Sequence, residues 1–63
     1  MAYRIKECRE EQGMSQEELA TKANVSRTII SGLETGTITV TTTGTLIKIA
    51  EALNKKVSDI FFD

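Results

Sequence analysis

One face of an expected helix over residues 27–35 carries side chains that form directional hydrogen bonds. Ile30 and Leu33 define the buried side of this helix. At about 100° per residue, the opposite side presents Thr28, Ser31, Gly32 and Thr35. Arg27 lies on the flank at the first turn, and an arginine can donate two hydrogen bonds to a guanine. A threonine methyl can contact a thymine methyl, so these residue types suit the edges of DNA bases.

Catalytic chemistry has little support in this chain of 63 residues. The sequence contains no histidine, which excludes a Ser-His-Asp triad and the usual histidine metal site. Cys8 occupies an apolar helical position and is expected to be a small core residue. The sequence also has no glycine-rich phosphate loop or nucleotide fingerprint. We therefore expect no enzyme, no catalytic or metal-binding residues, no cofactor and no small-molecule ligand.

A second amphipathic segment, residues 16–23, precedes this helix. Ser15 and Glu18 have the spacing of a capping box, which predicts that a helix begins directly after the serine. Leu19 and Ala23 are four residues apart and form an apolar stripe that faces inward. This segment is therefore expected to be the supporting helix.

The connection between the two helices has the residues of a tight turn. Asn24 stands where the chain must reverse, and asparagine tolerates left-handed backbone angles. Val25 is expected to fill the corner, and Ser26 can cap the second helix. In such a unit one helix supports the other, which is held out for a groove.

A set of residues in a fixed order extends along nearly the whole chain. The strings are Ser15-Gln16-x-x-Leu19-Ala20, Val25-Ser26-x-x-x-Ile30-Ser31-x-x-Glu34-x-Gly36 and Leu46-x-x-Ile49-Ala50-x-x-Leu53, flanked by Arg4-Ile5-Lys6 and Val57-x-x-Ile60-Phe61. The combined pattern resembles the helix-turn-helix of the Cro/phage-repressor family, often called XRE-type transcriptional regulators. The resemblance implies an all-α fold: a compact five-helix lambda-repressor-like DNA-binding domain. This single domain would span residues 1–63, with the helix-turn-helix at residues 16–35.

The resemblance also implies a function. It predicts a sequence-specific transcriptional regulator, a repressor, that inserts the helix over residues 27–35 into the major groove of a double-stranded DNA operator. The expected DNA-binding residues are Gln16, Ser26, Arg27, Thr28, Ser31, Thr35, Thr37 and Thr39. In the family, the amide at the position of Gln16 points toward the phosphates. The hydroxyls of Thr35, Thr37 and Thr39 would contact the DNA backbone. Gly32 would let the protein backbone lie close to the DNA.

Two further sets of residues are expected to hold the structure together. Residues at the positions of Arg9 and Glu34 often pair in this family and hold the first helix against the third. A homodimer is expected to form through the C-terminal segment, with Val57, Ile60, Phe61 and Phe62. Two adjacent phenylalanines on a short helix cannot both bury against one core, which favours a dimer patch. The alternative is that both fold over the small core.

The remaining helices follow from their periodicity. A first helix is expected over residues 3–12, with Ile5 and Cys8 on its inner face, and a fourth over residues 42–53. A short last helix is expected over residues 59–62, with Ser58 as its cap. The segment over residues 37–41 alternates as a strand would, but no partner strand is evident. We therefore expect an extended loop there, within a stretch that holds seven threonines between Thr35 and Thr45.

The net charge of −1 and the pI near 5.3 argue against DNA binding. They predict a modest salt dependence of binding per subunit. They also leave open a protein-interaction module of the same fold, antitoxin-like or anti-repressor, with little DNA affinity. No run of about 20 apolar residues and no apolar signal sequence is present, so no membrane contact is expected. The expected location is the cytoplasm.

Overall fold

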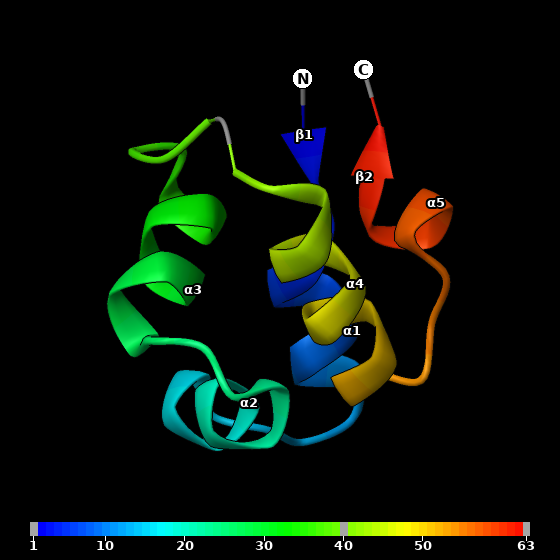
Figure 1. Ribbon diagram of the computed structural model, residues 1–63. Helices are drawn as coiled ribbons and strands as arrows, with labels where there is room; N and C mark the ends of the chain where they lie inside the picture. Colours follow the sequence, from blue (N-terminus) through cyan, green and yellow to red (C-terminus); the bar gives the residue numbers. More distant parts are fainter. Residues whose placement is uncertain (1, 40, 63) are drawn as a thin grey trace.

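The computed structural model describes residues 2–39 and 41–62. Its elements, in chain order, are β1 (Ala2–Tyr3), α1 (Ile5–Glu11), α2 (Gln16–Ala23), α3 (Arg27–Thr35), α4 (Thr43–Ala52), α5 (Val57–Ile60) and β2 (Phe61–Phe62) (Figure 1). The predicted five-helix, all-α fold is confirmed. Two strands of two residues each add to it, and these were not predicted.

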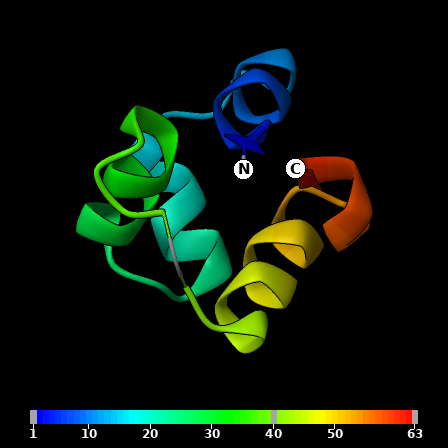
Figure 2. The same cartoon turned by 90° about the horizontal axis from the view of Figure 1, so that it is seen from above.

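Every helix contributes to one hydrophobic core. The largest fully buried side chains are Ile5, Leu19, Ile30, Ile49, Leu53 and Ile60, which come from α1, α2, α3, α4, the residue that ends α4, and α5. The helices surround this core as a ring when the molecule is seen from above (Figure 2). The principal extents of the molecule are 25 × 21 × 19 Å, so there is no room for a second layer of helices outside this core. Because no helix can bury its apolar stripe alone, each one is positioned by the others.

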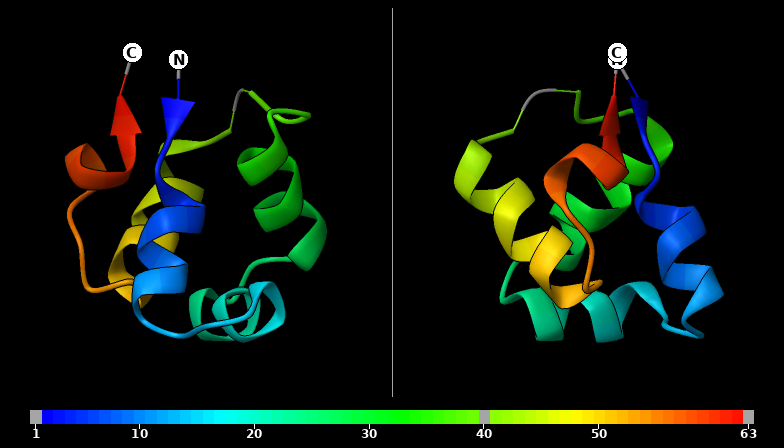
Figure 3. Two further views of the ribbon diagram at one scale, coloured as in Figure 1. Left: turned by 180° about the vertical axis from the view of Figure 1, so that it is seen from behind. Right: turned by 90° about the vertical axis from the view of Figure 1, so that its right-hand side faces the viewer.

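The two ends of the described chain lie side by side (Figure 3). β1 pairs with β2 antiparallel, with Tyr3 opposite Phe61 and Ala2 opposite Phe62. The amide of Arg4 donates to the carbonyl oxygen of Ile60 at 2.8 Å and extends this pairing. The expected helix over residues 3–12 was therefore wrong at its start, because Tyr3 belongs to a strand.

The expected last helix was also displaced. The Asp59 carboxylate accepts from the backbone N–H of Lys56 at 2.9 Å, so α5 begins at Val57 and ends at Ile60. Ser58 lies inside this helix and does not cap it. Phe61 has extended backbone angles, φ −127° and ψ 129°, because it pairs with β1.

The segment between α3 and α4 is a loop in its described part, as expected. Residues 37–39 and 41–42 form no helix or strand, and Val40 lies outside the described residues. The Thr42 hydroxyl accepts from the amide of Thr45 at 3.2 Å and caps α4, which is one residue shorter at each end than the expected helix over residues 42–53. No helix among the described residues is long and apolar enough to cross a membrane.

Candidate functional site

The start of α2 is fixed by its own first turn. The Ser15 hydroxyl accepts from the Glu18 amide at 3.0 Å, and the Glu18 carboxylate accepts from the Ser15 amide at 2.9 Å. The predicted capping box is therefore present, and the helix begins at Gln16. The hydrogen bonds from Ser15 lower the pKa of the Glu18 carboxyl below its ordinary value.

The turn between α2 and α3 also has the predicted geometry. Asn24 takes left-handed backbone angles, φ 58° and ψ 43°, and ends α2. The Ser26 hydroxyl accepts from the amide of Ile29 at 3.2 Å, so α3 begins at Arg27. Val25 is half-buried against the core, which fixes the angle between the two helices. This turn determines which face of α3 remains exposed.

A groove follows the exposed face of α3, which forms one edge of the molecule (Figure 1). It is lined by Gln16, Arg27, Thr28, Ser31, Gly32, Thr35, Thr37 and Ile38. Six of the eight side chains expected to bind DNA therefore lie together, and they come from α2, α3 and the following loop. The other two line different hollows: Ser26 lies beside Asn24, and Thr39 lies beside Tyr3 near the chain ends.

An ion pair behind this groove joins α1 to α3. Arg9 donates to Glu34 through Nε at 2.9 Å and through Nη2 at 3.1 Å, and through Nη1 to the Met14 carbonyl oxygen at 2.7 Å. The expected pairing is present, and Arg9 is only 8% exposed. The hydrogen bond with Glu34 raises the pKa of the Arg9 guanidinium above its ordinary value. The hydrogen bonds of this pair hold the back of α3 against α1.

Gln16 belongs to the same network, which the sequence did not indicate. Its side-chain Nε2 donates to Oε1 of Glu34 at 3.1 Å, and the side chain is half-buried. One amide hydrogen is thus used inside the protein, while the residue also lines the groove. Gln16 therefore connects the start of α2 to the ion pair that holds α3.

The threonines at the end of α3 are engaged with each other. The Thr35 hydroxyl donates to the carbonyl oxygen of Ser31 at 2.9 Å, and its oxygen lies 3.1 Å from the Thr37 hydroxyl oxygen. A hydroxyl has one proton, so Thr37 must donate to Thr35 in this arrangement. Before either hydroxyl could donate to a phosphate, it would have to break the hydrogen bond that it donates within the protein.

Gly32 lines the groove and is packed against Ile38, a contact that the sequence did not indicate. The glycine is buried, and a Cβ built on it would lie 2.5 Å from both Cγ1 and Cδ1 of Ile38. The Ile38 amide donates to the Gly32 carbonyl oxygen at 2.9 Å. Glycine inside a helix costs about 1 kcal/mol relative to alanine, but here only glycine leaves room for Ile38. An isoleucine within the threonine stretch was the available signal for this contact.

The expected dimer patch is only partly available. Ile60 is fully buried in the core and cannot contribute to a surface patch. Val57 and Phe61 are half-buried, and the Phe61 ring lies 5.4 Å from the ring of Tyr3, centroid to centroid. The side chain of Phe62 lies outside the described residues. Of the four residues expected in the dimer patch, Ile60 is therefore a core residue instead.

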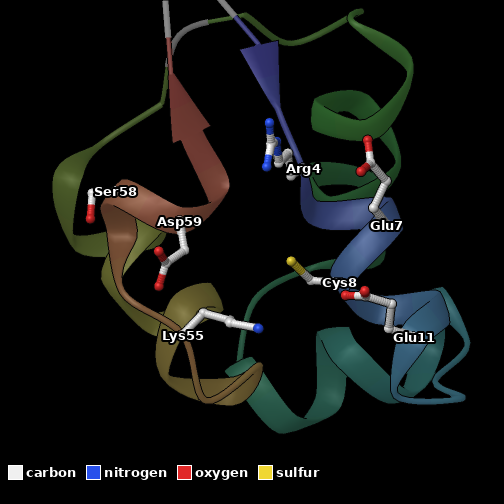
Figure 4. A pocket seen from close by; sticks show the side chains of 7 residues that line it. All are labelled: Arg4, Glu7, Cys8, Glu11, Lys55, Ser58 and Asp59. Atoms are coloured by element: carbon white, nitrogen blue, oxygen red, sulfur yellow. The ribbon is translucent and has the colours of Figure 1, made fainter.

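Another hollow lies between α1 and α5 (Figure 4). Arg4, Glu7, Cys8, Glu11, Lys55, Ser58 and Asp59 line it. Cys8 at its floor is 7% exposed and part of the core, as expected. Both charge signs are present, and within residues 2–39 and 41–62 no three His, Cys, Asp or Glu side chains are placed to hold a metal ion.

Comparisons with known proteins agree with this geometry. The helix-turn-helix family matches residues 5–60, which is most of the chain. The chain belongs to the helix-turn-helix family of the Cro/phage-repressor (XRE) type. A comparison with curated proteins gives no significant match.

Solved structures of similar helix-turn-helix chains extend this comparison. One is SinR, the master regulator for biofilm formation, in complex with DNA, at 36% identity and a TM-score of 0.84; the match covers 87% of each chain. Another belongs to the complex of the SinR and SinI proteins, at 36% identity and a TM-score of 0.85. That match covers 89% of this chain but only 54% of the matched chain in the complex, so this chain spans about half the length of the matched chain.

Proposed function

We propose that this protein is a sequence-specific DNA-binding transcriptional regulator, a repressor, that inserts α3 into the major groove. The observation that carries the proposal is the groove on α3, where six polar side chains from three segments lie together. The 36% identity to SinR, which was solved in complex with DNA, supports the same role.

The groove residues divide into two roles by position and chemistry. Arg27 and Thr28 stand exposed at the first turn of α3, the part of a recognition helix that contacts base edges, and Ser31 follows one turn later. Arg27 donates to a guanine and Thr28 offers a methyl and a hydroxyl. Gln16 of α2, Thr35 at the end of α3 and Thr37 of the following loop also line the groove, and they contact phosphates.

The charge distribution makes this a site with few ionic contacts. Arg27 is the one cation that lines the groove, and the charge of Arg9 is neutralised by Glu34 behind it. Each phosphate neutralised by a cation adds about −0.9 to the slope of log affinity against log salt. The salt dependence per subunit is therefore modest, and base contacts supply much of the preference for one site.

The regulator binds as a homodimer. Two recognition helices in successive major-groove turns lie about 34–36 Å apart, so each lies about 17 Å from the symmetry axis. The longest principal extent of the described chain is 25 Å, which is compatible with an axis that passes close to a face of this domain. The half-buried side chains of Val57 and Phe61 line a hollow near the chain ends and supply apolar surface for that contact.

A second candidate is a protein-interaction module with little DNA affinity. The match to the SinR and SinI complex and the net charge of −1 favour it. A module of this kind does not need an exposed Arg27 and Thr28 in one groove with Ser31, so the arrangement of the groove favours DNA.

Selection from a random DNA pool, followed by sequencing, tests the proposal. We expect enrichment of a two-fold symmetric site by the wild type and loss of that enrichment in Arg27→Ala. Lys22→Ala is the matched control, because this exposed lysine of α2 lines a different hollow. Weak binding without enrichment, which disappears at physiological salt, would contradict the proposal and favour the protein partner. Sedimentation with the selected DNA distinguishes one copy from two.

A further inference from the structure

One large apolar side chain lies over the outer face of α3, and it belongs to the loop that follows this helix. Among the residues that line the groove, Ile38 alone is a large aliphatic side chain. It is half-buried: one side packs against the core cluster, while the other contributes to the groove surface. Its position over Gly32 places it between the turn that carries Ser31 and the end of α3.

We propose that Ile38 contacts the 5-methyl group of a thymine in the major groove, in place of the side chain that position 32 lacks. This rests on the proposed function and adds a specificity-determining residue to it. Position 32 faces the groove with no side chain of its own, and the Ile38 atoms fill the space where a Cβ would stand. Recognition at this point therefore depends on a residue outside the recognition helix.

The chemistry of the groove favours a methyl group as the partner. Thr28, Ser31 and Thr35 supply hydroxyls around Ile38, so only the Ile38 surface lacks a hydrogen-bonding group. The thymine methyl is the apolar feature that the major groove presents, while the other base edges offer donors and acceptors. A donor or acceptor placed against Ile38 would lose its water without gaining a bond.

Two contacts hold Ile38 in one place. Its amide donates to the Gly32 carbonyl oxygen at 2.9 Å, which anchors the loop to α3. The absence of a Cβ at Gly32 lets the side chain lie flat on the helix, since a Cβ would approach Ile38 to 2.5 Å. Gly32→Ala therefore displaces Ile38 while it leaves the isoleucine itself intact.

The test replaces thymine by uracil, one position at a time, in the DNA site selected by the wild type. Uracil differs from thymine only by the missing methyl, so the protein is unchanged in this arm. We expect one thymine in each half-site at which uracil weakens binding about fourfold, as the burial of one methyl predicts. In Ile38→Ala and in Gly32→Ala the same replacement should have no effect. Ile47→Ala, at an exposed isoleucine of α4, is the matched control.

Each outcome separates the contact from the proposed function. If the wild type selects no site, the regulator proposal fails and the thymine contact fails with it. If a site is selected but no uracil replacement matters, or the loss persists unchanged in Ile38→Ala and Gly32→Ala, Ile38 does not contact a methyl. Thermal unfolding shows that each variant is folded, and Ile38→Val, which removes one methyl group, should reduce the uracil effect only in part.

Discussion

Arg9 of α1 binds Glu34 of α3 through two hydrogen bonds, at 2.9 and 3.1 Å, and both side chains are almost fully buried. Glu34 also accepts from Gln16 of α2, so a single carboxylate connects three helices. The groove is on the exposed face of α3, and this carboxylate is on the side that faces α1 and α2. The position of the recognition surface therefore depends on an ion pair that does not need to touch DNA.

The first prediction concerns the stability that this pair provides. Arg9→Met leaves the Glu34 charge buried with only Gln16 as its partner, and it should lower the free energy of unfolding by about 3–5 kcal/mol. The double variant Arg9→Met with Glu34→Leu should recover part of this loss, because no buried charge is left alone. Urea unfolding measures both, and Lys6→Met on the exposed side of α1 is the control. Equal stabilities for Arg9→Met and Lys6→Met would contradict the role of the pair.

A second prediction follows from the capping box at the start of α2. Hydrogen bonds from Ser15 lower the pKa of the Glu18 carboxyl in the folded protein below its ordinary value of 4.5. The carboxylate thus adds stability above about pH 4.5, and this contribution is lost as the pH falls through the lower folded pKa. Unfolding measured between about pH 6 and pH 2 should show this loss in the wild type. The loss should be smaller in Glu18→Gln, and Glu17→Gln, which removes a charge without a cap, should retain it. Identical pH profiles for the two variants would contradict the assignment.

The third prediction concerns alanine substitutions at two glycines, which should change the stability of the protein in opposite directions. Gly36 ends α3 with φ +86°, and a side chain in this left-handed region costs about 1–2 kcal/mol even though no atom lies within 4 Å. Gly44 lies in the first turn of α4, also with open space around it. Gly36→Ala should therefore destabilise the protein, while Gly44→Ala should stabilise it by about 0.5–1 kcal/mol. Thermal unfolding checks both, and a stabilising Gly36→Ala would show that the loop rearranges.

The fourth prediction tests the single cation of the groove. Arg27→Ala should weaken binding to the selected site by about 1–3 kcal/mol and relax the preference at the base it contacts. It should reduce the salt slope by less than a phosphate-binding lysine would, because a base contact displaces fewer counterions. Lys22→Ala should retain the base preference. A uniform loss across all sequences would instead assign Arg27 to a phosphate.

The sequence predicted the helix-turn-helix well because its boundaries are set by neighbouring residues. Ser15 with Glu18, Asn24 and Ser26 each act within three or four positions, and the structure has each of them in the expected conformation. The groove followed from the same information, since a helix with Ile30 inside has a determined outer face. Six of the eight expected side chains therefore lie in one place.

Long-range contacts account for what the sequence did not show. Strands of two residues have no detectable period, so the pairing of Tyr3 with Phe61 could not be inferred. Ile60 was grouped with the two adjacent phenylalanines as part of a dimer patch, but its position in α5 places it in the core. The role of Gly32 was interpreted from α3 alone. A glycine is needed there because Ile38, six positions later in the following loop, packs against it. The charge network around Glu34 likewise needs three helices in place.

Because Ala2 pairs with Phe62, the same fold can also form when the helices follow one another along the chain in a different order. Paired strands lie about 4.8 Å apart, and an extended residue spans about 3.3–3.6 Å, so a linker of a few residues can join the two ends. New ends can then be opened in the exposed turn at Lys55, between α4 and α5. Such a circular permutant keeps the groove on α3 and would begin with α5.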